Sequence, residues 1–362
     1  MADEAVNPPR SSITLPDIVF PTLVVVAAYA IVPAFASNYL IEAILLPFLS
    51  LSLAAVGLNL LTGYCGQISL GSGAFMAVGA YAAFNFDLRI EELPLVVSIV
   101  LAGVTTAGIG MLFGLPSLRL RGFYLAVSTL AAQFVVPWVL GKFGWFSNNS
   151  LSGVISAPRI SVAGFLLDDA IGRYLFSVSV VVVVTFLVWR LVTSAIGKNF
   201  IAVRDNVTAA RIVGVPVLQT KLLAFALSSF VIGIAGVLWA FTYLRTVEPI
   251  GFNLDRSFQL LFIIIIGGLA TVRGAFLGAA FIVGLPIMLS YAGNFVFGGT
   301  FDTGIVEMSQ RVVIGALIII LLIAEPSGLS ALLDRLKGLI FKKISRKTGI
   351  SLNSRSTRED AT

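Results

Sequence analysis

The stretch GLNLLTGYCGQISLGSGAFMAVGAY, residues 57–81, is apolar overall but carries six glycines. Glycine weakens an ordinary helix, whereas inside a membrane it permits close contact between helices or a broken helix around a cavity. The polar residues of the stretch gather where one apolar segment gives way to the next. The pattern therefore predicts a helix that ends, a polar junction, and a second helix that follows it.

Small residues in the second half of this stretch fall at helical spacing. Two adjacent rows result if residues 67–86 form a helix: Ser69, Gly73 and Ala77 in one, and Gly71, Phe75 and Gly79 in the other. A GxxxG pair, Gly274 and Gly278, occurs near the other end of the chain. Small residues let two backbones approach closely, so we expect six of these positions to serve helix packing: Gly71, Gly73, Ala77, Gly79, Gly274 and Gly278.

Polar side chains at the junction are a candidate lining for a solute pathway. They are Asn59, Thr62, Gln67, Ser69 and Ser72, and the apolar segment 122–140 adds Thr129 and Gln133 four residues apart on one face. Unpaired polar groups are costly in lipid, so these side chains must face protein, water or a solute. Two interpretations fit the pattern, namely pathway lining and hydrogen bonding between helices.

The composition of the whole chain agrees with a membrane protein. Of 362 residues, 58% are hydrophobic and only 12% are charged, and the mean hydropathy is +1.00. Apolar segments near 20 residues recur, each long enough to cross a hydrocarbon core about 30 Å thick as a helix. We predict an all-α polytopic membrane protein with about ten spans, at residues 18–36, 39–61, 67–86, 93–114, 122–140, 174–196, 222–243, 258–269, 275–291 and 312–324. The segment 258–269 is short for a full crossing, so a tilted, broken or re-entrant helix is expected there.

Lysine and arginine in the connecting loops predict the orientation. The segment 197–221 carries Lys198, Arg204, Arg211 and Lys221 against one acid, and the segment after residue 326 is also basic. Positive loops stay in the cytoplasm, which places both termini inside. We predict a cytoplasmic tail at 1–16, a transmembrane domain at 17–326 with a cytoplasmic loop at 197–221, and a basic cytoplasmic tail at 327–362. That tail either binds anionic membrane lipid or serves topology alone.

Several functional classes find little support in the sequence. There is no histidine, Cys65 is the single cysteine, and no Walker A motif occurs. We therefore predict no catalytic, metal-binding or cofactor-binding residues, and any nucleotide that drives transport must be bound by another chain. The absence of a central charged relay argues against an ion-driven secondary carrier. The basic residues fit topology better than nucleic-acid binding.

The segment RDNVTAARIVGVPVLQTK, residues 204–221, predicts a short cytoplasmic helix at 207–213. Asp205 or Asn206 is suited to cap its start, and Gly214 followed by Pro216 is suited to end it. A helix of two turns is unstable alone, so it requires a partner surface. The small residues Ala209 and Ala210 permit close approach of a docked subunit. The competing interpretation is a solvated charged loop.

Taken together, these stretches resemble the LivM/LivH family of permeases from branched-chain amino acid ABC importers, and the length favours the LivM branch. The resemblance rests on residues 57–81, on GFYLAV at 122–127, on 204–225 and on GGLATVRGAFLG at 267–278. It implies an ABC importer permease fold in a bacterial inner membrane. It also implies a LivH-type permease partner, two LivG/LivF-type ATP-binding cassette subunits that use ATP, and a periplasmic binding protein.

The resemblance also implies how the chain contacts its ATPase. Importers of this class carry an EAA-x-x-x-G pattern in the coupling segment, and here Thr208 stands in place of the acid. The coupling residues expected are Arg204, Asp205, Thr208, Ala209, Ala210, Arg211 and Gly214. The implied cargo is a branched-chain amino acid. Related permeases serve urea, short amides, or other amino or aromatic acids, and the binding protein largely selects among them.

Overall fold

The structure is a computed structural model that describes residues 15–90, 93–118, 123–150, 154–158, 160–162 and 165–297, together with 312, 313, 315, 316, 319, 320, 323, 328–333 and 335. In these ranges the chain is predominantly helical, which confirms the all-α class predicted from the sequence. The predicted tails at 1–16 and 327–362 and the last predicted span, 312–324, lie largely outside the described residues.

Long helices account for most of the chain. They are α1 (Leu15–Phe35), α3 (Leu46–Asn59), α4 (Ser72–Arg89), α5 (Leu95–Leu118), α6 (Phe123–Lys142), α7 (Ala170–Thr193), α10 (Val217–Leu238), α11 (Leu254–Gly267) and α12 (Val272–Phe297). The shorter elements are α2 (Asn38–Leu40), α8 (Ala195–Asp205), α9 (Val207–Ile212), the π-helical η1 (Ile41–Leu45), η2 (Leu60–Tyr64) and η3 (Trp239–Leu244), and the 3-10 turn η4 (Pro249–Phe252).

Length and composition make this chain a multi-pass membrane protein. Among the described residues, six helical stretches are long and apolar enough to cross a bilayer: Asn38–Tyr64, Leu95–Leu115, Ala170–Thr193, Val217–Leu244, Pro249–Gly267 and Val272–Tyr291. Every span predicted between residues 18 and 291 overlaps a helix. The short predicted span at 258–269 corresponds to α11, which η4 precedes and Gly268 ends.

Two predicted boundaries are wrong in an informative way. Residues 65–71 are not helical, so α4 begins at Ser72 rather than at 67. Ser69 and Gly71 therefore do not belong to helical rows, although Gly73, Ala77 and Gly79 do lie on α4. The second error concerns α7, which ends at Thr193, because the extended backbone of Ser194 breaks the helix and starts α8.

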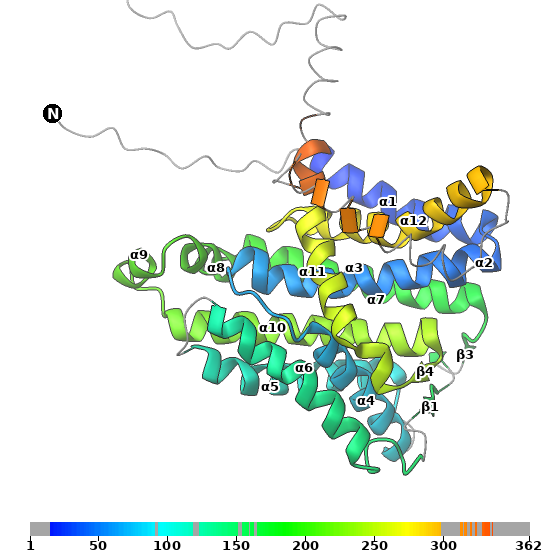
Figure 1. Ribbon diagram of the computed structural model, residues 1–362, viewed down its shortest axis with the longest axis horizontal. Helices are drawn as coiled ribbons and strands as arrows, with labels where there is room; N and C mark the ends of the chain where they lie inside the picture. Colours follow the sequence, from blue (N-terminus) through cyan, green and yellow to red (C-terminus); the bar gives the residue numbers. More distant parts are fainter. Residues whose placement is uncertain are drawn as a thin grey trace, which may run out of the picture.

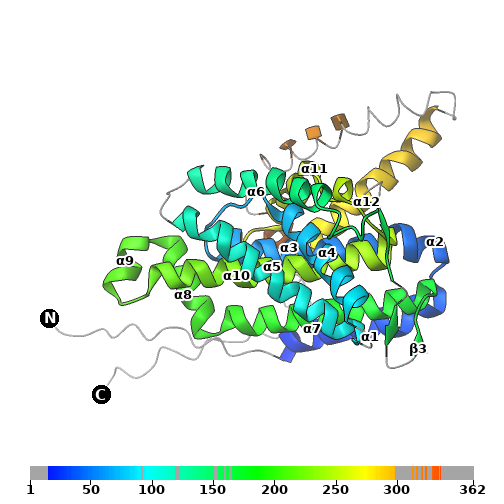
Figure 2. The same cartoon turned by 90° about the horizontal axis from the view of Figure 1, so that it is seen from below.

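The two ends of the helical bundle differ in character. In Figures 1 and 2, α3, α7 and α10 run along the long axis of the molecule, and α8 and α9 lie at one end. At the opposite end lie α2 and the short strands (Figure 1). There β1 (Ile155–Ser156) pairs antiparallel with β4 (Thr246–Val247), and β2 (Ser161–Val162) pairs with β3 (Phe165–Leu166).

The centre of the bundle is formed by α3 and α10. Both are buried over most of their length, whereas α5, α7, α11 and α12 bury less than half of their most apolar segments. A membrane helix that is buried on all sides must be surrounded by other helices rather than by lipid. Accordingly α10 packs against α3, α4 and α5, and these contacts define the core.

Glycine sets the distance between α4 and α10. A Cβ atom built at Gly79 would lie 2.1 Å from the carbonyl oxygen of Gly233, and one built at Gly236 would lie 2.1 Å from that of Met76. No real side-chain carbon tolerates such a separation, so only glycine permits this approach. Ala77, on the same helix, is fully buried.

The GxxxG pair of α12 has the same use. A Cβ atom at Gly278 would lie 2.0 Å from the carbonyl oxygen of Ile263, and one at Gly274 would lie 2.6 Å from that of Gly267. Each of these acceptors belongs to α11, so α11 and α12 form a tight helical hairpin around the turn at 268–271.

Candidate translocation and coupling sites

The junction between η2 and α4 lies deep in the bundle. After η2 ends, the chain runs without helical structure from residue 65 to 71 and returns toward the middle of the molecule, where α4 begins (Figure 1). The N–H of Leu70 donates to Thr129 Oγ1 at 2.9 Å, and the N–H of Ala74 donates to Gln133 Oε1 at 2.8 Å. Both acceptors lie near the middle of α6, so α4 starts about halfway along that helix.

Gln133 and Ser257 cap the start of α4 from other helices. The first N–H groups of any helix have no partner within it, and Gly71 at the N-cap position offers no side chain. Ser257 Oγ accepts from the N–H of Gly73 at 2.8 Å and donates to Gln133 Oε1 at 2.8 Å. Gln133 Nε2 in turn donates to the carbonyl of Phe252 at 2.8 Å. The buried node joins α4, α6, η4 and α11.

The sequence did not point to Ser257. This residue lies 184 positions from Gly73, in the mixed polar and apolar stretch LDRSFQ at residues 254–259, so no local pattern marks it. Its partner Gln133 was predicted because a buried amide in an apolar helix requires a polar environment.

Asn59 holds the turn between α11 and α12. Its Nδ2 donates to the carbonyl of Thr271 at 2.8 Å, and its Oδ1 accepts from the N–H of Ala270 at 2.9 Å. Ala270 has a φ of 58°, a conformation that non-glycine residues rarely adopt, and the asparagine stabilises the backbone there. The end of α3 is thereby fixed to the α11–α12 hairpin.

The remaining predicted pathway residues divide into two groups. Thr62 Oγ1 donates to the carbonyl of Gln67 at 3.1 Å, and Ser69 Oγ accepts from the N–H of Gly71 at 3.4 Å. In contrast, the hydroxyl of Ser72 and Oε1 of Gln67 are buried without a hydrogen-bond partner. The structure thus brings most of the predicted residues together around one junction, and their role in transport stays a prediction.

At one end of the bundle, α8 and α9 form a compact projection. Asn206 caps α9, because its Oδ1 accepts from the N–H of Thr208 at 3.0 Å and from that of Ala209 at 3.1 Å. The helix covers residues 207–212, one residue fewer than predicted. Gly214 follows with a φ of +90°, which favours glycine at this helix stop.

Large apolar side chains are exposed at the tip of this projection. Ile212 and Val213 are each 82% exposed, and Leu218, at the start of α10, is 60% exposed. Of the two alanines expected to permit docking, Ala209 is exposed and Ala210 is buried. Thr208 and Arg211 are also exposed. The side chains available to a partner therefore include Thr208, Ala209, Arg211, Ile212 and Val213, but not Ala210.

Arg204 connects this projection to the junction. Its Nη1 donates to the carbonyl of Gly63 at 3.0 Å, while its Nη2 forms an ion pair with Asp205 at 2.9 Å. A Cβ atom at Gly66 would lie 2.8 Å from Cγ of Arg204. The last residue pair of α8 is therefore packed directly on the end of η2.

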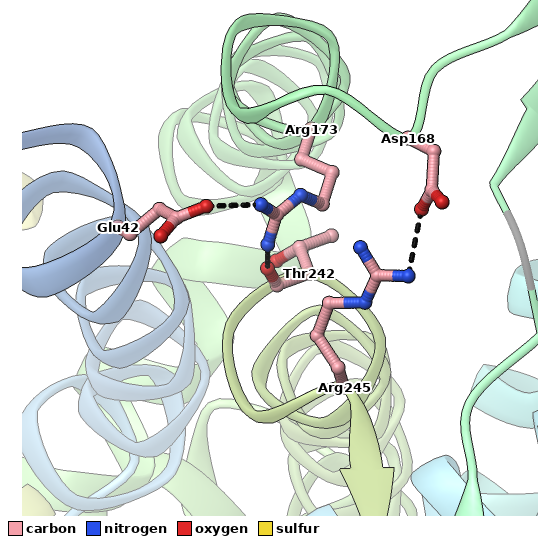
Figure 3. A network of polar contacts seen from close by, with 5 residues as sticks. All are labelled: Glu42, Asp168, Arg173, Thr242 and Arg245. Carbon is pink, nitrogen blue, oxygen red and sulfur yellow. Dashed lines mark hydrogen bonds and ion pairs between the residues drawn. The ribbon is translucent and has the colours of Figure 1, made fainter. Parts of the chain in front are cut away.

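At the other end of the bundle, charged residues form a network (Figure 3). Arg173 is buried and lies between Glu42 of η1, with which it forms an ion pair, and the carbonyl of Thr242 in η3, to which Nη1 donates at 3.0 Å. Beside it, Arg245 pairs with Asp168 at 2.8 Å. The side chain of Glu42 is 51% exposed, so the pair is hydrated on one side.

No pattern in the sequence assigns a role to Arg173. Arg173 begins an apolar segment, where a cation is ordinarily a topological signal, and its two acceptors lie far away in the sequence. Both acceptors belong to π-helical turns, a distortion common at functional sites.

A multi-pass helical protein with a broken central segment and a capped helix projecting from one end has the general form of a membrane permease. Comparison with known families agrees, since residues 40–322 match the family described as branched-chain amino acid transport system / permease component. The chain belongs to this family.

Three curated relatives illustrate its range. The high-affinity branched-chain amino acid transport system permease protein LivM of Salmonella typhimurium is 30% identical over 258 residues, which are 63% of this chain and 58% of that protein. A probable LivM of Methanocaldococcus jannaschii is 24% identical over 329 residues, 80% of this chain and 93% of the relative. The autoinducer 2 import system permease LsrC of Klebsiella pneumoniae is 33% identical over 133 residues, 36% and 39% of the two chains. No solved structure matches this chain.

Proposed function

We propose that this chain is the membrane-spanning permease subunit of an ATP-driven importer for branched-chain amino acids, and that it forms half of the translocation pathway. It binds no cofactor itself, and separate subunits bind and hydrolyse the ATP. The names of the LivM relatives support the cargo, and the family match supports the role of permease.

The observation that carries the proposal is the projection formed by α8 and α9. A helix of six residues is too short to be stable by itself, yet Asn206 caps it and it presents Ile212 and Val213 to the surroundings. Exposed apolar side chains grouped at a tip indicate a protein contact. Arg204 links this tip to the end of η2. A movement of the tip imposed by a docked ATPase would therefore be transmitted directly to the junction.

The orientation follows from the same elements. A cytoplasmic position for α8 and α9 is supported by the basic residues Lys198, Arg204, Arg211 and Lys221. In this orientation the network around Arg173, at the other end, faces the periplasm. We infer that a second, LivH-type permease completes the pathway, that two LivG/LivF-type ATPases dock at the tip, and that a periplasmic binding protein delivers the amino acid.

The alternative is the same machine with another cargo. The Klebsiella relative is named for the import of autoinducer 2, and this observation favours a cargo that is not an amino acid. Uptake measured with leucine and with autoinducer 2 in parallel separates the two proposals.

The decisive experiment is uptake of radiolabelled leucine by proteoliposomes that contain this chain with its partner subunits and a loaded binding protein. We expect accumulation that requires ATP. Ile212→Glu should abolish it while leaving the subunits able to fold, because the changed side chain is solvent-exposed. Ile250→Glu is the matched control, because Ile250 is also an isoleucine, is 81% exposed, and lies in η4 next to β4, away from the tip. Accumulation by the purified chain alone, with no nucleotide-hydrolysing subunit, would contradict the proposal.

A further inference from the structure

We propose that the N-terminal end of α4 binds the carboxylate of the amino acid in transit, and that the hydroxyl of Ser72 is its side-chain donor. This inference rests on the proposed function, since it assigns a site to the cargo of that importer. It names the atoms at the start of α4 that the amino acid would contact.

The position of the junction is the first argument. Residues 65–71 are not helical. They begin at the end of η2, where Gly66 packs against Arg204, and reach the depth of the middle of α6 at Leu70, whose N–H bonds to Thr129. Irregular backbone at membrane depth is tolerated only where protein or a water-filled cavity covers it. Yet Ile68, just before Leu70, is 52% exposed on this chain. The segment therefore faces a partner or an aqueous pathway rather than lipid.

The second argument is the set of polar atoms left without partners. Ser72 occupies the first position of α4, its side chain is fully buried, and its hydroxyl has no hydrogen-bond partner. Gln67, 3% exposed, likewise has a free Oε1 at the same junction. Leaving a buried polar atom without a partner is costly, and two such atoms belong to this junction, so both are available to bind a polar ligand.

The third argument is the charge that the site prefers. The start of a helix carries about half a positive charge and presents N–H groups, which suits an anion. The N–H groups of Gly73 and Ala74 are occupied by the neutral oxygens of Ser257 and Gln133. A carboxylate is the stronger acceptor for such donors.

Exchange of these acceptors for a carboxylate costs the protein little. Ser257 Oγ donates to Gln133 Oε1 at 2.8 Å, and Gln133 Nε2 donates to the carbonyl of Phe252. Both side chains therefore keep a hydrogen-bond partner when the N–H groups of Gly73 and Ala74 donate to the carboxylate instead. The free Oε1 of Gln67 supplies an acceptor for the ammonium group of the same amino acid.

Ser72→Ala is a sharp test because the hydroxyl makes no bond in the ligand-free protein. Removing an unpartnered buried hydroxyl leaves stability unchanged or raises it. A loss of binding in a variant of undiminished thermal stability therefore reports on the ligand. Ser98→Ala in α5 is the matched control, since Ser98 is also fully buried with an unpartnered hydroxyl but lies outside the junction.

The measurement is equilibrium binding of radiolabelled leucine to the assembled permease complex in nanodiscs, without binding protein, with leucine or leucinamide as competitor. We expect wild type to prefer leucine over leucinamide by about tenfold or more, since leucinamide lacks the carboxylate. Ser72→Ala should weaken leucine binding about tenfold without affecting leucinamide, and Ser98→Ala should match wild type.

Several outcomes would overturn this assignment. They are equal affinity for leucine and leucinamide in wild type, wild-type affinity in Ser72→Ala, and no leucine binding by a complex that imports leucine. If the wild-type importer shows no ATP-dependent uptake of leucine at all, the proposed function fails, and this assignment fails with it. Uptake in wild type thus separates failure of the site from failure of the function.

Discussion

Two polar networks of this protein differ in chemistry and in place. The network in the middle of the bundle, around Gln133 and Ser257, consists of neutral amides, hydroxyls and backbone groups that are fully buried. The network at the end opposite α9, around Arg173 and Glu42, uses full charges and retains contact with solvent. Burying a charge costs far more than burying a hydrogen-bonded neutral group, and in the charged network Glu42 keeps half of its side chain exposed to solvent.

This difference indicates different roles for the two networks. The neutral node fixes α6, α11 and η4 to the start of α4, and its members are shielded from water. The charged network joins η1, α7 and η3, and water can replace either partner when these elements separate. We propose that this chain lines a pathway that opens alternately to each side of the membrane. Such a pathway requires helices that stay together at the centre and helices that can separate at one end.

The largest expected effect comes from removing the neutral node. Gln133→Leu leaves the N–H of Ala74 and the carbonyl of Phe252 buried without this partner, and each such group costs about 1–3 kcal/mol. We expect a loss of about 3 kcal/mol or more, measured as thermal unfolding of the purified chain in detergent. Gln219→Leu, on the exposed side of α10, is the control. A difference below about 1 kcal/mol between the two would contradict the role of the node.

Arg173→Met should have an intermediate effect. It removes the partner of Glu42 and the donor to the carbonyl of Thr242. Breaking a fully buried ion pair costs about 3–5 kcal/mol, but Glu42 is half-exposed and regains water, so we expect about 2 kcal/mol by the same unfolding assay. Arg173→Lys, which keeps the charge but not the planar fork, should lie between wild type and Arg173→Met. If Arg173→Met unfolds as readily as Gln133→Leu, the contrast between the networks is wrong.

The smallest effect is expected at the exposed rim of the charged network. The side chains of Asp168 and Arg245 are 37% and 40% exposed, and such pairs contribute about 0–1 kcal/mol. Asp168→Asn should therefore lower stability by less than about 1 kcal/mol, and this difference should vanish in high salt because ions screen exposed charges. An effect that is larger, or that persists at high salt, would show that the whole network acts as a buried unit.

The helix α9 was predicted well because its signals are local. Asn206 caps it and Gly214 ends it within a window of nine residues, so the neighbouring sequence contains the whole of the information. The same logic could have found α8, because Ser194 accepts from the N–H of Ile196 as an N-cap does. The apolar segment that continues to residue 196 concealed this break.

The start of α4 was predicted poorly for the opposite reason. Residues 65–71 have no regular secondary structure, but their composition does not distinguish them from the start of the helix that follows. What ends the irregular segment is the set of acceptors that Thr129, Gln133 and Ser257 provide from elsewhere. The residue types at the junction were identified from the sequence, but the atoms that they bind were not.

By itself, the sequence determined that this chain is a helical membrane protein with a polar, glycine-rich junction and a short capped helix. Hydrophobic length and helix capping depend on residues within a few turns, so they can be read along the chain. Only the tertiary structure decided that Asn59 binds the turn 212 positions away, that Arg173 joins two π-helical turns, and that Ser72 is left without a partner. Hydrogen-bond partners between helices are fixed by packing, and packing depends on all of the helices at once.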